Sequence, residues 1–564
     1  MKKRLLAFMV LLTVLCMTFP AFADGTTGKI TGSCGKNLTY EYDPSLKTLT
    51  ISGTGKMADY DKDITNLGVI PEWRKSGIEN NLEKVVIEDG VESVGDYAFY
   101  WCKNITNVTI PNSIKNINDY AFYSCKALTS ITIPDGVTSI GKNAFAYCNE
   151  IKEITIPKSA ICIGEMSFYG CENLKSVAIQ DGVKTIGDSA FSFCEKLEKI
   201  TIPDSVISIG NEAIYPTPIN NSSSEWDVLY IGNHLIKADQ WTFTEKINNG
   251  SVSDTYQVKA GTKTIADNAF ESCKGLKKIA IPESVTHIGN KAFRSCSSLT
   301  DITIPKNVKG IGDGAFYKCC NLTNVSIDAN NTAYCSENGV LYDIGKTKLM
   351  FYPSKKTETS FSIPKGVTSI GFGAFSDCTA LTSVTIPYGM KSIGGYAFHG
   401  CKGLTSIKIP DGVKSIGEYA FQSCVGLTSV TIPNSITNIG SSAFSLCDAL
   451  TEVNYTGTQE DWKNIDKGDG YLANENIVKY CPGIWITRHG DKIVVEPINI
   501  SAGKTVILAL YDGDRFVEIQ QSDEYSNENK EITFTSTKHY TRAKVMIWNS
   551  LSEMSPVCDF KIIE

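Results

Sequence analysis

The sequence contains few of the residues and motifs that enzymes use for catalysis. Histidine occurs five times in 564 residues, each time in a different local setting. No H-E-x-x-H, G-x-S-x-G, Walker-type or C-x-x-C motif is present, so zinc hydrolases, serine hydrolases, P-loop enzymes and dithiol redox proteins have no support. We therefore expect no enzyme activity, no cofactor and no metal. The competing hypothesis is an enzyme site hidden in one of the two insertions described below.

The chain also lacks runs of basic residues. Its formal net charge is −7 and no Lys/Arg cluster stands out. Proteins that bind nucleic acid or anionic lipid need such a cluster, so we expect neither as a partner.

Long apolar segments are missing as well, apart from the N-terminus. Residues 1–23 combine a basic start, an apolar run over residues 5–17 and the tripeptide Ala21-Phe22-Ala23. This pattern predicts a secretory signal peptide cleaved after Ala23. The alternative, a membrane anchor, is disfavoured because the run is too short to span a bilayer. The sequence thus predicts a secreted or cell-surface protein without a transmembrane segment.

The dominant positive feature is a repeat of 23 residues. Leu128–Glu150 shows its pattern, L-x-x-I-x-I-P-x-x-V-x-x-I-G-x-x-A-F-x-x-C. The phenylalanine of the Ala-Phe pair recurs in register, with one degenerate copy at Ala213-Ile214: Phe99, Phe122, Phe145, Phe168, Phe191, Phe270, Phe293, Phe316, Phe375, Phe398, Phe421 and Phe444. A fixed period of this length predicts a solenoid of stacked coils, because one unit cannot bury its own apolar face. Each coil should hold two short extended pieces, with a tight bend at a glycine such as Gly141.

Cysteine is abundant, with nineteen residues, but its distribution argues against a disulfide framework. Twelve cysteines occupy one position of the repeat: Cys102, Cys125, Cys148, Cys171, Cys194, Cys273, Cys296, Cys319, Cys378, Cys401, Cys424 and Cys447. We expect them to be buried free thiols in a core column, where cysteine acts as a small hydrophobic residue. Disulfide pairing among the off-column residues stays open: Cys34, Cys162, Cys320, Cys335, Cys481 and Cys558.

The residues L-x-x-I-x-I resemble the strand half of a leucine-rich repeat. The cysteine, however, stands after A-F-x-x, at the far end of the unit. Together with I-P-x-x-V-x-x-I-G-x-x-A-F, this pattern resembles the BspA-like leucine-rich-repeat surface proteins of bacteria, over roughly residues 24–483. The resemblance implies a right-handed, β-rich leucine-rich-repeat coil with a parallel sheet, and a role in adhesion or binding.

The repeat divides the chain into regions. After the signal peptide we expect an N-terminal cap at 24–81, with strands near 38–42 and 48–52 in a hairpin over the first coil. The solenoid follows at 82–456. A C-terminal cap or linker at 457–483 should begin with a short helix, because Thr458 and Asp461 fit a capping box. Alternating segments in 484–564 predict a small β-sandwich domain, and Lys544–Pro556 resembles modules at the ends of secreted bacterial proteins.

Two insertions interrupt the repeat, near residues 215–259 and 328–358. The second contains a hairpin pattern at 338–342 and 349–353. Both predict expanded coils whose loops either carry function or merely bulge.

Aromatic residues around the A-F-x-x-C corner of the N-terminal coils are the candidate ligand-binding site. They are Tyr97, Tyr100, Trp101, Tyr120, Tyr123, Tyr147 and Tyr169, with Phe193 next in line. Middle coils place Glu271, Ser272, Arg294 and Ser295 at the same positions, so the fold does not require aromatic residues there. A contiguous aromatic patch favours contact with a protein or glycan. The alternatives are packing between coils or cover by the cap.

Three functions compete at this point. The first is a secreted or cell-surface protein that binds host proteins, matrix or glycans outside the cell. The second is a passive spacer of the cell envelope without a specific ligand. The third is the hidden enzyme. Ligand identity, mode of cell attachment and oligomeric state are not specified by the sequence.

Overall fold

A computed structural model describes residues 28–61, 70–221, 227–472 and 477–480, and the strands between 484 and 563. The predicted signal peptide lies outside these residues. Contacts divide the chain into two compact units. The first comprises residues 1–180, 189–200 and 214–218, and the second comprises residues 181–188, 201–213 and 219–564.

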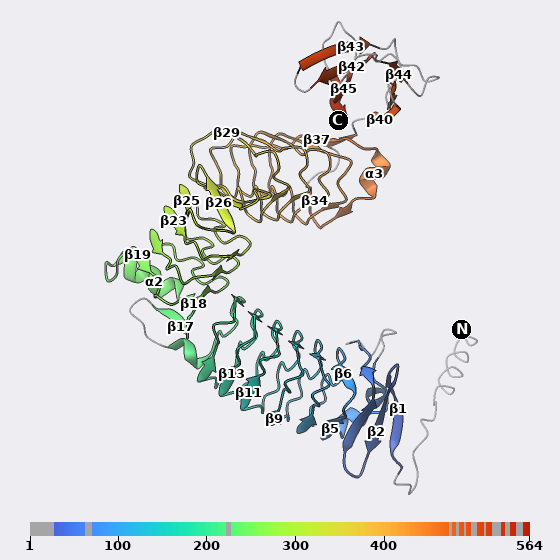
Figure 1. Cartoon of the computed structure of the whole chain (residues 1–564), viewed down its shortest axis with the longest axis vertical. Coiled ribbons are helices and arrows are strands. Elements are labelled where there is room, and N and C mark those ends of the chain that lie inside the picture. Colours follow the sequence, from blue (N-terminus) through green and yellow to red (C-terminus); the bar gives the residue numbers. More distant parts are fainter. Residues whose placement is uncertain are drawn as a thin grey trace, which may run out of the picture. The chain divides into compact units, whose positions relative to one another are not determined.

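The repeat region forms coils that stack on one another (Figure 1). Each regular coil contributes two short strands that pair in parallel with those of the next coil. Glu153–Ile156 (β11), for example, pairs with Ser176–Ile179 (β13), and Ser139–Ile140 (β10) pairs with Cys162–Ile163 (β12). Partners are 23 residues apart, which confirms the predicted parallel-sheet solenoid of the leucine-rich-repeat type.

The strands fall into two series. The first strands of successive coils are β5 (Lys84–Ile87), β7 (Asn107–Thr109), β9 (Ser130–Ile131), β11, β13, β15 (Lys199–Thr201), β19 (Thr255–Gln257), β21 (Lys278–Ala280), β23 (Asp301–Ile304), β25 (Asn324–Ile327), β29 (Ser360–Ser362), β31 (Ser383–Thr385), β33 (Ser406–Lys408), β35 (Ser429–Ile432), β37 (Glu452–Tyr455) and β39 (Val478–Tyr480). The second strands are β4 (Gly55–Lys56), β6 (Val91–Val94), β8 (Asn116–Ile117), β10, β12, β14 (Thr185–Ile186), β16 (Ser208–Ile209), β18 (His234–Ala238), β20 (Thr264–Ile265), β22 (His287–Ile288), β24 (Gly310–Ile311), β28 (Lys348–Phe351), β30 (Ser369–Ile370), β32 (Ser392–Ile393), β34 (Ser415–Ile416), β36 (Asn438–Ile439) and β38 (Asp466–Lys467).

The repeated phenylalanines form the core. Phe122, Phe145 and Phe168 are fully buried, and their ring centroids lie 5.3 Å apart in nearly parallel stacks. The same stacking joins Phe375, Phe398, Phe421 and Phe444 in the second unit, at 4.9 to 5.1 Å. This column was predicted from the period.

The twelve cysteines of the column are free and buried, as predicted. Off the column, Cys34, Cys162, Cys320 and Cys335 are also free thiols. Cys481 and the side chain of Cys558 lie outside the described residues.

The glycine of the I-G pair is needed for a different reason than the predicted tight bend. A Cβ atom on Gly141 would lie 2.6 Å from the backbone carbon of Asn118 in the preceding coil. Close approach between coils therefore excludes a side chain, and the Gly141 backbone is outside the left-handed region.

The N-terminal cap is larger than the predicted hairpin. Strands β1 (Ile30–Gly35), β2 (Leu38–Asp43) and β3 (Thr48–Gly53) form an antiparallel meander, and β3 pairs in parallel with β5. Helix α1 (Glu72–Lys75) and the 3-10 turn η1 (Ile78–Asn80) follow. Trp73 of α1 is fully buried and stacks on Phe99 at 5.7 Å, so it closes the phenylalanine column.

Both insertions are expanded coils. The first contains η2 (Pro218–Asn221), the antiparallel hairpin of β17 (Val228–Ile231) and β18, and helix α2 (Gln240–Asn248), whose buried Phe243 contacts Phe270. The second contains β26 (Tyr334–Glu337), β27 (Val340–Asp343) and β28 in an antiparallel meander. The predicted hairpin is the pair β27 and β28.

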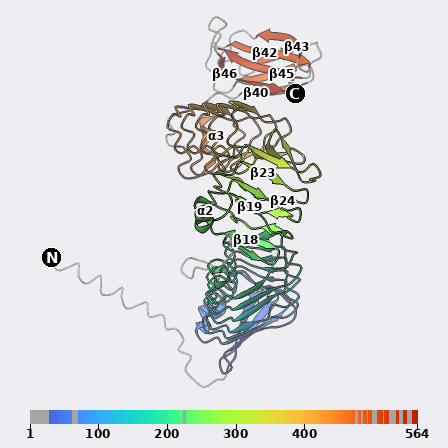
Figure 2. The same ribbon diagram turned by 90° about the vertical axis from the view of Figure 1, so that its left-hand side faces the viewer.

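The C-terminal part of the chain begins with the predicted helix. Helix α3 (Gln459–Lys463) starts with a capping box between Thr458 and Asp461, and its Trp462 is buried against Tyr455. Two antiparallel sheets then follow, as expected for the small sandwich (Figure 2). Their strands are β40 (Ile484–His489), β41 (Lys492–Pro497) and β44 (Ile532–Thr535), and β42 (Thr505–Asp512), β43 (Arg515–Gln521), β45 (Arg542–Trp548) and β46 (Pro556–Ile563).

Candidate functional site

The predicted site lies on the turn segment, the third side of each coil, which runs from the I-G glycine position to the column cysteine. Alternate N–H groups of this segment donate to carbonyl oxygens of the next coil. In the first regular coil, Tyr97 donates to Asp119 at 3.0 Å, Phe99 to Ala121 at 2.8 Å and Trp101 to Tyr123 at 2.8 Å.

This hydrogen-bonding pattern needs two left-handed residues per turn segment. Tyr97 has φ 54° and Trp101 has φ 63°, and Tyr120 and Tyr147 occupy the same positions in later coils. A bulky residue is disfavoured in this conformation, where glycine and asparagine fit best. Other coils indeed place Asn143, Gly170, Ser272 or Gly314 at these positions. The backbone conformation therefore does not explain why aromatic residues stand there.

The structure brings all seven predicted residues together, with Phe193 as the eighth. We call this set the aromatic ladder. Its ring contacts are unbroken: Tyr97–Tyr120 at 4.7 Å, Tyr97–Tyr100 at 5.4 Å, Tyr100–Trp101 at 6.1 Å, Tyr100–Tyr123 at 5.0 Å, Tyr120–Tyr123 at 5.6 Å, Tyr123–Tyr147 at 5.5 Å, Tyr147–Tyr169 at 5.5 Å and Tyr169–Phe193 at 5.1 Å.

None of the ladder residues is fully buried. Trp101 is 48% exposed and Phe193 is 47% exposed, whereas the tyrosines are half-buried. Two cations lie over the rings: the Arg74 guanidinium is 5.6 Å from the centroid of Tyr100, and Lys103 Nζ is 4.4 Å from that of Trp101. The N-terminal cap therefore contributes Arg74 to one end of the ladder and leaves the rings open to solvent.

Ring packing between coils also stabilises the ladder. The stack of Tyr97 on Tyr120, with 5° between the ring planes, is of the kind that contributes about 0.5–1.5 kcal/mol. Burial raises the pKa of Tyr97 and of Tyr147, so both phenols are protonated at neutral pH. The ladder therefore offers neutral hydroxyl groups and partly exposed ring faces.

Sequence reasoning missed a second group of aromatic residues on the turn segments of later coils. We call Tyr317, Phe372, Tyr396, His399 and Tyr419 the second aromatic cluster. Tyr396 contacts Tyr317 at 5.3 Å, Phe372 at 5.1 Å, His399 at 5.7 Å and Tyr419 at 4.8 Å. The signal was present in the sequence, because the tripeptide Tyr-Ala-Phe at 396–398 and 419–421 repeats that at 97–99 and 120–122.

The described ranges offer no metal site. They contain no group of three or more His, Cys, Asp or Glu side chains placed to hold a metal ion. His234 is fully buried, its Nε2 lies 3.0 Å from the carbonyl oxygen of Pro203, and burial lowers its pKa. This histidine is part of the packing between coils of the second unit.

The fold and the repeated turn segments define a leucine-rich-repeat solenoid protein. The BspA type leucine rich repeat region, a family defined over six repeat copies, matches residues 78–171, 117–240, 245–338 and 347–465. These matches cover more than half of the chain, and the chain belongs to this family.

Several solved structures of bacterial proteins are similar to the chain. A leucine-rich cell surface protein from Faecalibacterium prausnitzii A2-165 is 25% identical over 79% of this chain and 99% of its own, with a TM-score of 0.32. A leucine-rich repeat protein from Eubacterium ventriosum ATCC 27560 is 24% identical over 78% and 85%, with a TM-score of 0.30. The pneumococcal vaccine antigen PcpA is 17% identical over 81% and 94%, with a TM-score of 0.32. No curated protein matches the chain.

Within the described ranges, no helix is both long and apolar enough to cross a membrane.

Proposed function

We propose that this protein is a secreted or cell-surface binding protein, and that the aromatic ladder contacts a protein or glycan outside the cell. The observation that carries the proposal is the unbroken line of eight aromatic residues on five successive coils, each at least partly exposed. Exposed aromatic patches on soluble proteins commonly mark contact sites.

The choice of residues supports binding over a purely structural role. Serine occupies the Trp101 position in other coils, at Ser124, Ser272 and Ser295, with the same left-handed backbone. Those coils stack without an aromatic side chain at that position. Tyrosine and tryptophan supply large contact areas at low cost in side-chain entropy, which is why they are enriched among residues that dominate binding energy.

Location outside the cytoplasm rests on the N-terminal sequence. The basic start, the apolar run and Ala21-Phe22-Ala23 predict export and cleavage after Ala23. Twelve cysteines held as buried thiols are compatible with an oxidising compartment, because their side chains are inaccessible to a second cysteine outside the column.

The test uses the mature chain from Asp24 on an array of extracellular matrix proteins and glycans. The variant Trp101→Ser with Tyr123→Gln introduces residues that the chain itself uses at the equivalent positions, Ser124 and Gln422. We expect affinity for the captured ligand to fall at least about tenfold, which corresponds to about 1.4 kcal/mol. The melting temperature should stay within a few degrees.

The matched control is Trp241→Ser on helix α2, where tryptophan is 77% exposed and outside the ladder. This variant should bind like the wild type. If the ladder variant binds equally well but melts at a lower temperature, the rings are packing elements and the passive-spacer function is favoured. Fractionation of cells that express the full chain tests the location.

A further inference from the structure

The repeat of turn segments is broken between residues 312–319 and 371–378, in the second unit. In the coil before this seam, the N–H groups of Lys291, Phe293 and Ser295 donate to Asp313, Ala315 and Tyr317. The chain after Cys319 enters the second insertion, so a full turn segment next follows at Gly371. The N–H groups of Gly314 and Phe316 donate no hydrogen bond to any described residue.

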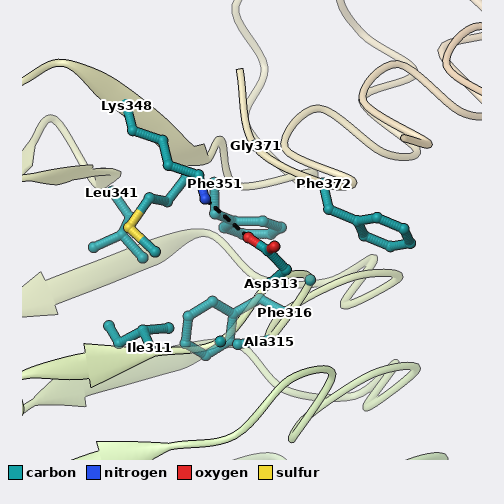
Figure 3. A pocket seen from close by; sticks show the side chains of 12 residues that line it. Ile311, Asp313, Ala315, Phe316, Leu341, Lys348, Phe351, Gly371 and Phe372 are labelled. Atoms are coloured by element: carbon teal, nitrogen blue, oxygen red, sulfur yellow. Dashed lines mark hydrogen bonds and ion pairs between the residues drawn. The ribbon is translucent and has the colours of Figure 1, made fainter. Parts of the chain in front are cut away.

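The seam contains a small cleft, which Gly314 and Phe316 help to line (Figure 3). Its lining includes the apolar side chains of Leu341 and Phe351, and Lys348 and Asp313, which also line it, form an ion pair of 2.9 Å. The cleft is small, with room for about one water-sized group. One oxygen atom of a ligand can therefore enter, while the rest must lie outside.

The second aromatic cluster adjoins this cleft, because Phe372 belongs to both. Gly314 makes room for the Phe372 ring, since a Cβ atom there would lie 2.7 Å from it. Likewise, a Cβ atom on Gly373 would lie 2.5 Å from the ring of Tyr317. The two glycines thus let the rings close over the seam, with Tyr396 and His399 half-buried beside them.

Three buried polar atoms at the cluster have no hydrogen-bond partner among the described residues. Tyr317 is 3% exposed and its hydroxyl has no hydrogen-bond partner among the described residues, and neither does Nε of Arg294. Buried polar groups are normally paired, so unpaired ones indicate a missing partner. Nδ1 of His399 is a third such atom.

The charges around the rings also indicate a missing partner. Lys291 lies 5.3 Å from the centroid of Phe372 and Lys318 lies 5.4 Å from that of Tyr317. Both lysines are half-buried, and within the described chain neither has a carboxylate at ion-pair distance. Arg294 pairs with Glu271 at 2.8 Å.

Two further carboxylates lie near the cluster. Asp377 accepts a long contact from the Cys320 thiol at 3.8 Å. Burial raises the pKa of the Tyr396 phenol, and Glu418 lies close enough to raise it further. Arg294 Nε and the N–H groups of Gly314 and Phe316 can only donate, and Lys291 and Lys318 are cations, so acceptor-rich, acidic groups complement this surface. The acidic groups of a complementary ligand would lie near Lys291 and Lys318, and its rings would cover aromatic faces.

We propose that the seam and the second aromatic cluster form a binding site for an acidic saccharide, a sugar chain that carries carboxylate groups. One oxygen of the ligand accepts a hydrogen bond from the N–H group of Gly314 or Phe316 in the cleft, a carboxylate pairs with Lys318 or Lys291, and a sugar ring packs on Tyr396. This site uses none of the residues of the aromatic ladder and is independent of the proposed function.

The test is isothermal titration of the mature chain with a hyaluronan hexasaccharide, and with maltohexaose as a neutral sugar of equal length. The variants are Tyr396→Ser, which matches Ser442 at the same left-handed position, and Lys318→Gln, which removes one charge. The control is Lys414→Gln, at an exposed lysine outside the cluster. Circular dichroism confirms that each variant is folded, and Lys318→Gln decides the outcome if Tyr396→Ser lowers the melting temperature.

We expect the wild type to bind the hyaluronan hexasaccharide. Its affinity for maltohexaose should be at least about tenfold lower. Tyr396→Ser should weaken binding about tenfold and Lys318→Gln several-fold, with less difference at high salt because exposed charges are screened. Lys414→Gln and the ladder variant Trp101→Ser with Tyr123→Gln should bind like the wild type.

Three results would each overturn the proposal: no binding of the hexasaccharide at millimolar concentration, equal binding of the neutral sugar, or binding that neither cluster variant changes. Loss of array binding in the ladder variant concerns the proposed function alone, because that variant leaves the seam intact.

Discussion

At the scale of the residue, the column cysteines show why this repeat uses a thiol. The Sγ atom of Cys125 donates to the carbonyl oxygen of Phe99 at 3.3 Å, and that of Cys148 donates to Phe122 at 3.2 Å. Each thiol therefore links its own coil to the preceding phenylalanine. Cysteine is small and apolar enough for a fully buried position and still supplies a weak donor.

Burial gives these thiols a predictable dependence on pH. It raises the pKa of Cys102, Cys148 and Cys194 to about 12, from a value of 9.0. Above pH 9 the unfolded chain loses the thiol protons while the folded chain keeps them. The free energy of unfolding therefore falls as pH rises through this range, by up to about 1.4 kcal/mol per thiol per pH unit.

The first prediction is steep alkaline unfolding. Ten column thiols have a pKa raised mainly by burial: Cys102, Cys125, Cys148, Cys171, Cys194, Cys273, Cys296, Cys319, Cys378 and Cys401. Their combined effect over one pH unit is on the order of the whole stability of a domain. We expect the melting temperature, measured by circular dichroism, to be flat from pH 7 to 8.5 and to drop sharply between pH 9 and about 10.5.

A variant with alanine at Cys125, Cys148 and Cys171 provides the comparison. It should be less stable at pH 7, because small cavities form, but its melting temperature should fall less steeply above pH 9. An equally steep fall in the variant would assign the alkaline transition to other groups, such as the buried tyrosines.

The second prediction concerns thiol reactivity. Cys320 is exposed, whereas all twelve column cysteines are buried. Burial and the nearby Asp377 raise the pKa of the Cys320 thiol and slow its reaction, but maleimide should still label Cys320 in the folded protein at pH 7.5 and leave the column unmodified. After denaturation without a reductant, mass spectrometry should find the twelve column thiols labelled, and column disulfides in that experiment would contradict the structure.

At the scale of the element, the sequence predicted those features whose signals are local. Strands β2 and β3, the pair β27 and β28, and helix α3 each follow from alternation, turn residues or a capping box. Helix α1 was not predicted, because its four residues carry no period, and the role of Trp73 depends on contact with Phe99 in a later segment.

The sequence predicted the part of the candidate site that has a local signal, and it missed the part that depends on contacts between distant segments. The seven ladder residues stand out because they recur at fixed positions in consecutive coils. The left-handed backbone at Tyr97 and Trp101 was not predicted, since it results from hydrogen bonds to the next coil. The second aromatic cluster was missed because Tyr317 and Phe372 are 55 residues apart and meet only across an insertion.

The third prediction tests the capping box of α3. The Thr458 hydroxyl accepts the N–H of Asp461 at 3.1 Å, and the Asp461 carboxylate accepts the N–H of Thr458 at 2.9 Å. Thr458→Ala should destabilise this helix by about 1 kcal/mol. Hydrogen exchange of residues 459–464 should become roughly fivefold faster.

Glu460→Ala on the same helix is the control. Glu460 forms an exposed ion pair with Lys463 at 3.4 Å, and such pairs contribute little. This variant should exchange like the wild type. If Glu460→Ala accelerates exchange as much as Thr458→Ala does, general fraying rather than the cap controls the helix.

At the scale of the whole molecule, a change in one coil should affect the stability of the neighbouring coils only. Each coil pairs its strands with the coils before and after it, and Phe145 contacts the rings of Phe122 and Phe168. Repeat proteins of this kind are described by the intrinsic stability of each repeat and by its interfaces with neighbours. Damage to one coil should therefore have a limited range along the chain.

The fourth prediction measures that range with Phe145→Ala. Phe145 is fully buried, so its truncation should cost about 3–5 kcal/mol. We expect hydrogen exchange to accelerate in the flanking coils, residues 118–171, and to stay unchanged in the coils around Phe398 of the second unit. Tyr388→Ala, at a residue that is 58% exposed, should change neither region. Uniform acceleration over both regions would instead mean that the two units unfold as one cooperative structure, and the nearest-neighbour description would then be wrong for this chain.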